Sequence, residues 1–266
     1  MILGRGARLT LRTVALGYLG ALLLVPIAMI LARTFEDGVL AFWEQITTPA
    51  AVAALSLSLT IVAIVVPLNV VFGVVTALAL ARGRFRGRGL VQAVVDLPVA
   101  VSPVIVGVSL VLLWGADGWF GALADHGLRR IFSLPGMVLA TIFVTLPFVV
   151  REVEPVLHEI GVEQEQAAAT LGASPWQSFW RVTLPSIRWG LIYGVVLTVA
   201  RALGEFGAVI VVSAGVSGQS QTLTLLVHSR YIDDHNVFGA YAASTMLMFL
   251  ALVTLVLMTA LQRKRA

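Results

Sequence analysis

Six long apolar runs restrict the chain to folds that lie within a membrane. They cover about residues 13–33, 52–81, 90–114, 136–153, 187–213 and 237–261. A helix needs about 20 mostly apolar residues to cross roughly 30 Å of hydrocarbon, and the runs are close to that length or longer. Hydrophobic residues make up 59% of the chain and charged residues 12%, which excludes a soluble domain with a largely polar surface. The sequence therefore predicts an integral membrane protein with six transmembrane helices.

The runs favour helices over a β-barrel, because they are continuously apolar where barrel strands would alternate. We therefore expect an all-α membrane protein. The second run is too long for one upright helix, so we expect Pro67 to kink it or its end to enter the cytoplasm. Pro98 and Pro103 are expected to bend or interrupt the third run. The first run exceeds a signal-peptide core and lacks a clean cleavage site, so we interpret it as a retained helix.

The cationic residues are distributed unevenly around these runs. With the N-terminus in the cytoplasm, thirteen of the 18 lie on the cytoplasmic side: Arg5, Arg8, Arg12, Arg82, Arg84, Arg86, Arg88, Arg151, Arg181, Arg188, Arg263, Lys264 and Arg265. Three lie outside, namely Arg129, Arg130 and Arg230, while Arg33 is at a boundary and Arg201 is within a run. Positive residues accumulate on the cytoplasmic side of membrane proteins, so both termini are predicted to be cytoplasmic. The Arg-Gly stretch at 82–89 is interpreted as part of this signal and not as a nucleic-acid site.

A polar stretch at 161–190 separates the fourth and fifth runs and is also predicted to be cytoplasmic. Ser174 offers an N-cap, Pro175 suits the first helical position and Gln177 the third, which predicts a short helix beginning there. The aromatic residues that would share one face of it are Trp176, Phe179 and Trp180. They either contact a partner protein or pack on the chain's own helix ends or in the lipid interface, and their spacing fits both interpretations.

Two charged residues, Arg201 and Glu205, fall within the fifth run. Each costs about 2.5–3.5 kcal/mol at the centre of a membrane helix, so both should face the bundle interior or a water-filled path. Their i, i+4 spacing predicts one helical face. Arg201 would then offer a forked donor to a tetrahedral oxyanion, with Glu205 moderating its affinity; a self-satisfied pair or a contact with a partner subunit is the alternative. Asn69 and Asp96 are weaker signals of a functional site. Asp96 is interpreted as structural, forming hydrogen bonds to backbone groups that Pro98 and Pro103 leave unpaired.

The polar stretch resembles the EAA loop of ABC-importer permeases. The family pattern is Glu-Ala-Ala, a glycine after three intervening residues and Leu-Pro about a dozen later, and the matching residues are Gln166, Ala167, Ala168, Gly172, Leu184 and Pro185. Gln166 departs from the glutamate, although Glu163 and Glu165 lie just before it. Segments 66–73, 97–107, 135–152 and 171–209 resemble the sulfate/molybdate branch of type I permeases, and the similarity covers roughly residues 50–260.

This resemblance implies a type I, MetI-like permease fold. Residues 1–50 would form an N-terminal helix and an extracytoplasmic loop, and residues 51–262 a core with a cytoplasmic coupling loop at 157–186. The helix at Ser174 would be the coupling helix that docks on an ATPase. Gly172 would allow the turn before it, Leu184-Pro185 would end it, and Glu165 or a neutral hydrogen bond would replace the missing glutamate.

The resemblance also implies partners. These are a second, related permease, two ABC ATPase subunits that bind ATP and Mg, and an extracytoplasmic sulfate-binding protein, all at a bacterial cytoplasmic membrane. The chain's single lysine, Lys264, leaves no P-loop, so the chain itself is expected to be no enzyme. Its four histidines form no metal-binding pattern and are expected in loops. The resemblance thus implies a permease subunit of an ATP-driven sulfate/thiosulfate importer. The alternatives to this function are a molybdate or tungstate permease, expected as a homodimer, an ion-gradient-driven secondary transporter, and a purely structural membrane subunit.

Overall fold

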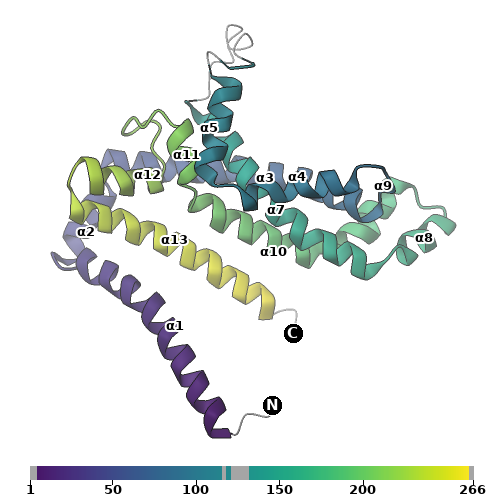
Figure 1. Ribbon diagram of the computed structural model, residues 1–266, viewed down its shortest axis with the longest axis horizontal. Helices are drawn as coiled ribbons and strands as arrows, with labels where there is room; N and C mark the ends of the chain where they lie inside the picture. The colour runs from purple at the N-terminus through teal and green to yellow at the C-terminus, as the bar shows by residue number, and fades with distance from the viewer. Residues whose placement is uncertain (1–4, 116–117, 121–131, 264–266) are drawn as a thin grey trace.

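Every regular element in the described part of the chain is a helix, which confirms the all-α prediction. The computed structural model describes residues 5–115, 118–120 and 132–263 (Figure 1). In chain order the elements are α1 (Arg5–Thr34), α2 (Gly38–Ile46), α3 (Pro49–Arg82), α4 (Arg88–Ala100), α5 (Pro103–Trp114), α7 (Leu134–Ile160), α8 (Glu163–Thr170), α9 (Pro175–Ser178), the π-helix η2 (Phe179–Thr183), α10 (Leu184–Leu203), α11 (Gly207–Val212), α12 (Leu223–His228), the π-helix η3 (Ser229–Asp233) and α13 (Val237–Arg263).

Five helical stretches in the described residues are long and apolar enough to cross a membrane: Leu9–Thr34, Pro49–Arg82, Leu134–Ile160, Pro175–Leu203 and Val237–Leu257. The predicted third run is instead the pair α4 and α5, which are bent by 114° at their junction. Pro103 takes an opening position of α5, whereas Pro98 remains inside α4. The six predicted spans are therefore present if this bent pair counts as one, and Pro103 is the proline at which the run breaks.

Helix α3 runs through 34 residues without a break at Pro67. The hydroxyl of Thr48 caps its start by accepting the N–H of Ala51. Helix α7 packs closely along α3, because a side chain at Gly73 would place its Cβ 2.7 Å from the Cβ of Val149. Small residues at such contacts let two helix backbones approach each other in a membrane. Helix α3 therefore continues past a proline that would be expected to weaken it.

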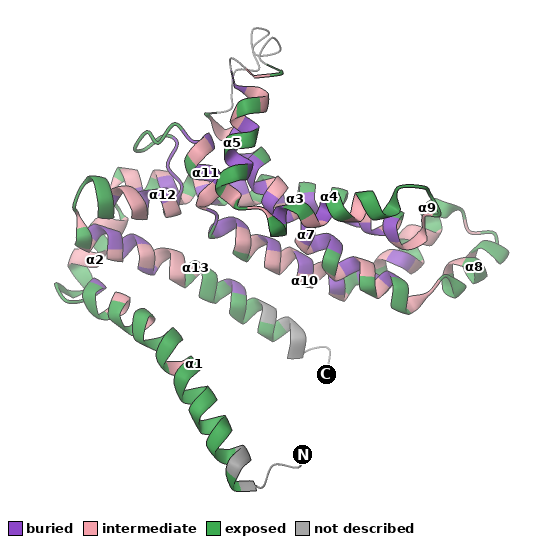
Figure 2. Ribbon diagram, viewed as in Figure 1, coloured by how far each residue is buried: buried purple, intermediate pink, exposed green. Residues whose placement is uncertain are grey.

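One buried apolar cluster lies where α3, α5, α7 and α11 meet, and a second lies where α3, α7 and α10 meet (Figure 2). Leu80, Leu157 and Ile187, one from each helix of the second cluster, are completely buried in it. On α10, a Cβ at Gly190 would lie 2.6 Å from the carbonyl oxygen of Glu152, and one at Gly194 would lie 2.9 Å from a backbone carbon of α7. The two glycines therefore allow α10 to pack closely against α7.

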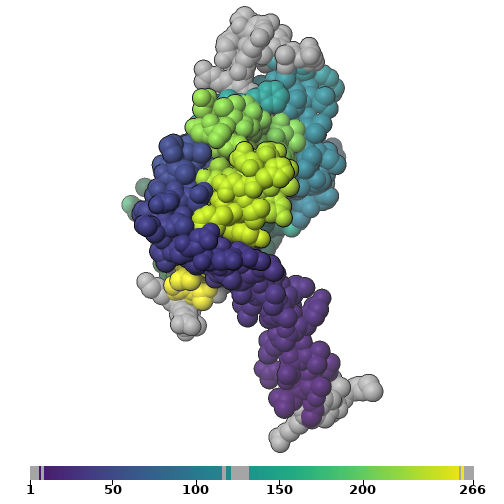
Figure 3. Space-filling model, turned by 90° about the vertical axis from the view of Figure 1, so that its left-hand side faces the viewer, coloured from purple at the N-terminus to yellow at the C-terminus, as the bar shows by residue number. Residues whose placement is uncertain are grey.

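Helix α1 projects away from the rest of the molecule, as the space-filling view makes plain (Figure 3). No described residue from Leu9 to Arg33 is buried in this chain. Only at its end does α1 join the body, where the Thr34 and Thr245 hydroxyls lie 2.8 Å apart and Thr34 is fully buried. Most of α1 therefore presents apolar side chains to its surroundings, as expected of a helix that contacts lipid or another subunit.

Arg230, one of the three arginines predicted on the extracytoplasmic side, connects separate helices. The Arg230 guanidinium is buried and donates hydrogen bonds to the carbonyl oxygen of Gly239 at 3.0 Å and to the hydroxyl of Thr48 at 2.8 Å. Burial lowers the pKa of Arg230 from its ordinary value, and the charge of Asp234 acts in the opposite direction. The other two, Arg129 and Arg130, lie outside the described residues, as do the predicted cytoplasmic Lys264 and Arg265.

Candidate functional site

The polar stretch between α7 and α10 folds into a short helix, a tight turn and a second helix. Gly161 ends α7 with a φ of +65°, and Gly172 follows α8 with a φ of +86°. No atom lies within 4 Å of where a Cβ on Gly172 would be. Glycine is therefore favoured there by the left-handed backbone and not by lack of space. This is the turn that the sequence predicted at Gly172.

The predicted start of the second helix is present with both hydrogen bonds of a capping box. The Ser174 hydroxyl accepts the N–H of Gln177 at 3.3 Å, and the Gln177 side-chain oxygen accepts the N–H of Ser174 at 2.9 Å. Pro175 takes the first helical position. These contacts satisfy backbone donors that every helix N-terminus leaves free.

The prediction that Leu184-Pro185 ends this helix is wrong. Helix α9 passes through the π-helix η2 directly into α10, giving one span from Pro175 to Leu203. A proline lacks an N–H and its ring crowds the carbonyl four residues earlier, here that of Arg181. In η2 the N–H of Leu184 bonds five residues back, to Phe179. This wider turn accommodates Pro185 without ending the helix.

The three aromatic residues of this segment form one cluster, but they are not equally exposed. The ring centroids of Trp176 and Trp180 are 5.5 Å apart, and Phe179 lies 5.4 Å from Trp180 and 6.1 Å from Trp176. Trp176 is 69% exposed and Trp180 is 50% exposed, whereas Phe179 packs partly against the core. The outward surface of the cluster is therefore formed by the two tryptophans.

The polar residues of α8 divide into an outward and an inward group. Glu163 and Gln166 are exposed. Glu165 points inward, where its Oε1 accepts hydrogen bonds from the Thr183 hydroxyl at 2.9 Å and from Arg82 Nη2 at 3.3 Å. The expectation that Glu165 replaces the missing family glutamate on the outer surface does not fit this geometry, because its carboxylate is already bound within the chain.

A groove of about 630 Å³ lies between α8 and the start of α10. Ala167 and Ala168 line one part of it, and Arg181 and Arg188 line another. The two alanines leave the groove open where larger side chains would fill it. The outer surface of the polar stretch thus combines two tryptophans, a groove with two arginines, and an exposed acidic residue.

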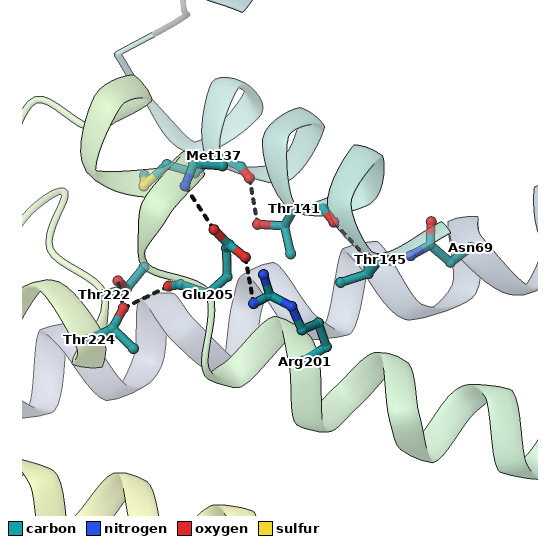
Figure 4. Close-up of polar contacts among 9 residues, drawn as sticks. Asn69, Met137, Thr141, Thr145, Arg201, Glu205, Thr222 and Thr224 are labelled. Atoms are coloured by element: carbon teal, nitrogen blue, oxygen red, sulfur yellow. Dashed lines mark hydrogen bonds and ion pairs between the residues drawn. The ribbon is translucent and has the colours of Figure 1, made fainter. Parts of the chain in front are cut away.

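The second candidate site is the pair Arg201 and Glu205, and here the predicted single helical face is wrong (Figure 4). Helix α10 ends at Leu203, so Glu205 lies beyond it in a non-helical link to α11. The pair nevertheless forms, with Arg201 Nη1 2.6 Å from Glu205 Oε2. The other carboxylate oxygen accepts the N–H of Ala208 at 2.8 Å and so caps α11. The predicted run at 187–213 is therefore interrupted, and Glu205 stabilises the interruption.

Contacts from α5 and from α12 surround this link. A Cβ on Gly207 would be 3.1 Å from the side chain of Pro103 in α5. The Thr224 hydroxyl donates to the Glu205 carbonyl oxygen at 2.8 Å, which uses an acceptor that a continuing helix would pair internally. The Glu205 side chain is 1% exposed and that of Arg201 is 33% exposed. Of this pair, only Arg201 reaches the surface of the chain.

Asn69 belongs to a buried polar column between α3 and α7. Its amide nitrogen donates to the Thr145 hydroxyl at 2.6 Å, Thr145 donates to the Thr141 carbonyl at 2.6 Å, and Thr141 donates to the Met137 carbonyl at 2.8 Å (Figure 4). Asn69 and both threonines are fully buried. Sequence reasoning missed the threonines, because hydroxyls in membrane helices commonly bond their own backbone and give no distinct pattern.

Asp96 has a side-chain partner instead of the freed backbone groups that were expected. Its Oδ1 accepts hydrogen bonds from Arg151 Nε at 2.9 Å and Nη2 at 2.7 Å, and Gln92 donates to Oδ2 at 3.2 Å. This forked contact joins α4 to α7. A structural role therefore fits Asp96, with a different partner from the one predicted.

The expectation that the histidines lie in loops is wrong for two of them. His158 is in the last turn of α7, 3.2 Å from Arg88 Nη2, and His228 ends α12 with its ring 5.3 Å from that of Phe206. His235 follows η3, and His126 lies outside the described residues. Within the described residues, no three potential ligands from histidine and acidic side chains lie together as a metal site would require.

Comparison with known proteins identifies relatives over nearly the whole chain. The profile of the family described as binding-protein-dependent transport system inner membrane component matches residues 69–266. The chain is 50% identical to the sulfate transport system permease protein CysW of Synechocystis, over 94% of this chain and 91% of that protein. It is 49% identical to the chloroplastic sulfate permease 2 of Chlamydomonas reinhardtii, over 91% of this chain but only 66% of that longer protein. It is 35% identical to CysT of Escherichia coli, over 91% of this chain and 88% of that protein.

A solved structure has the same arrangement of helices. It is a chain from a bacterial alginate ABC transporter in complex with an alginate pentasaccharide-bound periplasmic protein. The TM-score is 0.77, with 95% of this chain and 92% of that chain covered, and the sequence identity is 20%. At that identity the likeness concerns the fold alone, and it agrees with the predicted permease architecture.

Proposed function

The chain belongs to the family of binding-protein-dependent transport system inner membrane components, and on that premise we propose that it is a permease subunit of an ATP-driven sulfate importer. The observation that supports sulfate as the substrate is the 50% identity to a sulfate permease over 94% of the chain. Thiosulfate, a tetrahedral dianion of similar size, is included in the proposal. The chain itself forms a path and hydrolyses nothing.

The proposed complex contains a second permease of the CysT type. The chain is 50% identical to a CysW protein and 35% identical to a CysT protein, so the relatives include two distinct kinds of sulfate permease. Two ATPase subunits would bind ATP and Mg, and an extracytoplasmic binding protein would deliver the anion. The complex would lie in a bacterial cytoplasmic membrane, surrounded by lipid and independent of nucleic acid, with both termini and the 157–186 loop in the cytoplasm.

We assign the contact with the ATPase to α9 and its surroundings. Trp176 and Trp180 are exposed on a polar segment, and exposed tryptophans often dominate protein interfaces. Gln166 and Glu163 lie exposed on the neighbouring α8 and extend this surface. Closure of the ATPase pair would move α9, and the helix that continues from it through η2 into α10 would move with it.

We assign contact with the anion to Arg201. Its guanidinium is partly exposed and held by a buried carboxylate next to the break between α10 and α11. A guanidinium presents several donors in a planar fork that suits an oxyanion. Glu205 would orient this fork and lower its net charge, so that the anion binds without being trapped. Glu205 itself is buried and would not touch the anion.

The proposal is tested by reconstituting the chain with its CysT-type partner, the ATPase and the binding protein in proteoliposomes. We expect ATP-dependent uptake of radiolabelled sulfate that thiosulfate competes for. Uptake and ATPase stimulation by molybdate or tungstate, with none by sulfate, would assign the other cargo. Sulfate uptake by the chain alone, driven by a proton gradient without ATPase, would contradict the permease assignment.

The anion contact has its own test in the same system. Arg201→Gln removes the charged fork but retains a polar side chain, and we expect it to abolish most uptake while the complex still assembles. Arg12→Gln is the matched control, since Arg12 is an exposed arginine of α1, outside both the proposed anion contact and the proposed ATPase surface. Normal uptake by the assembled Arg201→Gln complex would remove Arg201 from the path.

A further inference from the structure

The Arg82 side chain joins three elements of the cytoplasmic end of the molecule. Arg82 is the last residue of α3, and its Nη1 donates to the Leu157 carbonyl in the final turn of α7 at 2.8 Å. Its Nη2 donates to the Gly161 carbonyl, just beyond α7, and to Glu165 in α8 at 3.3 Å. A cation at a helix C-terminus is favourable because the last carbonyls have no helical partners.

The same Glu165 oxygen receives a second hydrogen bond, from the far side of the loop. The Thr183 hydroxyl, in the last position of η2, donates to Glu165 Oε1 at 2.9 Å. Thr183 is 4% exposed, and the side chains of Arg82 and Glu165 are 19% and 26% exposed. One carboxylate oxygen therefore connects the end of α3 to the start of the helix that contains α10.

A buried apolar cluster lies next to these hydrogen bonds. Leu80, Leu157 and Ile187 form a fully buried cluster beside them and come from α3, α7 and α10. Hydrogen bonds to ionised groups are about twice as strong as neutral ones, and water reaches these only partly. By contrast, four residues separate α8 from α9, and Pro175, Trp176 and Gln177 of α9 are exposed, so α9 is joined to the bundle mainly through η2.

We infer that Arg82, Glu165 and Thr183 form the joint through which movement of α9 reaches α3 and α7. This inference rests on the proposed function, because it requires a motor that moves α9. A displacement of η2 would pull Thr183 against Glu165, and Glu165 would carry it through Arg82 to the ends of α3 and α7. Arg82 acts as a positioning residue: it contacts neither the anion nor the ATPase, and it determines whether ATP hydrolysis moves the path.

The test measures sulfate transported per ATP hydrolysed by the assembled complex in proteoliposomes. A residue that only supports folding would reduce the amount of complex and leave this ratio unchanged. We expect Arg82→Gln to lower the ratio by about fivefold or more, the lower end of typical couplings between sites, with the ATPase still bound in pull-downs. Thr183→Val, which removes one hydrogen bond and keeps the side-chain volume, should lower the ratio in the same direction.

Arg86→Gln is the matched control, since it removes the same charge from an exposed position in the link that follows α3, and it should keep the wild-type ratio. Wild-type ratios in assembled Arg82→Gln and Thr183→Val complexes would overturn the joint. If Arg82→Gln does not assemble, the ratio of Thr183→Val decides. A wild-type complex without ATP-driven sulfate uptake would instead overturn the proposed function and the joint with it, so the two failures are distinguishable.

Discussion

Arg201 and Glu205 form an ion pair across the end of a helix, with Nη1 and Oε2 2.6 Å apart although Glu205 lies beyond the last residue of α10. The two members differ in burial: the glutamate side chain is 1% exposed and the arginine 33%. This asymmetry separates their roles. The carboxylate stabilises the break between α10 and α11, and the guanidinium is the member that a solute can reach.

The asymmetry predicts unequal costs of removing each member. Arg201→Ala leaves a buried carboxylate without its cation and should lower the free energy of unfolding by about 3 kcal/mol or more. Glu205→Ala leaves an arginine that water partly solvates, so it should cost less, despite losing the cap on Ala208. Thermal unfolding of the purified protein in detergent measures both. The double variant should be more stable than Arg201→Ala. If the destabilisations of the two single variants simply add in the double variant, the two side chains are not energetically coupled.

The exposed tryptophans predict loss of ATPase binding without loss of folding. Trp176→Ala and Trp180→Ala should each weaken capture of the ATPase by about 2 kcal/mol, the usual threshold for a dominant interface residue. Unfolding temperatures should stay near wild type, because both side chains are largely exposed. Trp43→Ala serves as the control, since Trp43 is 59% exposed on α2, away from α9. Undiminished ATPase binding by the Trp176→Ala, Trp180→Ala double variant would contradict the assignment.

The turn at Gly172 predicts a backbone effect. Gly172→Ala introduces a Cβ at a φ of +86°, where L-residues are disfavoured by about 1–2 kcal/mol. We expect α9 to shift or fray, so that ATPase binding weakens and proteases cut more readily near residue 172. Gly17→Ala, in the interior of helix α1 with open space around it, is the control and should show neither change.

The buried column predicts a cost for removing its amide. Asn69→Ala leaves Thr145 without that partner and creates a cavity between α3 and α7, for which we expect about 1–3 kcal/mol of destabilisation. The unfolding temperature in detergent is the measurement. Thr60→Ala is the control, because the exposed Thr60 hydroxyl donates to the Ser56 carbonyl of its own helix. Equal effects of the two changes would show that the Asn69 contact adds nothing to stability.

Much of the local structure follows from the sequence because neighbouring residues produce it. Ser174, Pro175 and Gln177 specify a capping box by their order alone, and Gly172 marks the turn before it. The apolar runs similarly specify membrane helices, since their length matches the hydrocarbon thickness. In each case the physical cause acts within a few residues, or between the chain and its solvent.

The errors arise where the local pattern allows more than one structure. Pro185 suggests a helix end, yet the π-turn of η2 carries the helix past it. Glu165 and Gln166 are adjacent and look alike in sequence, but only Glu165 meets Arg82, which is 83 residues away. Nothing local distinguishes the inward from the outward residue.

The sequence by itself determined that the chain lies in a membrane, the class of fold and the places where helices begin. The length of an apolar run and the capping of a helix are local properties of the chain. The tertiary structure alone decided that the fifth run breaks at Glu205, that α4 and α5 meet at 114°, and that Arg201 is partly exposed while Glu205 is buried. At the break, Pro103 packs against Gly207 and Thr224 binds the Glu205 carbonyl. Such contacts join residues far apart in the chain, so no local pattern in the sequence reveals them.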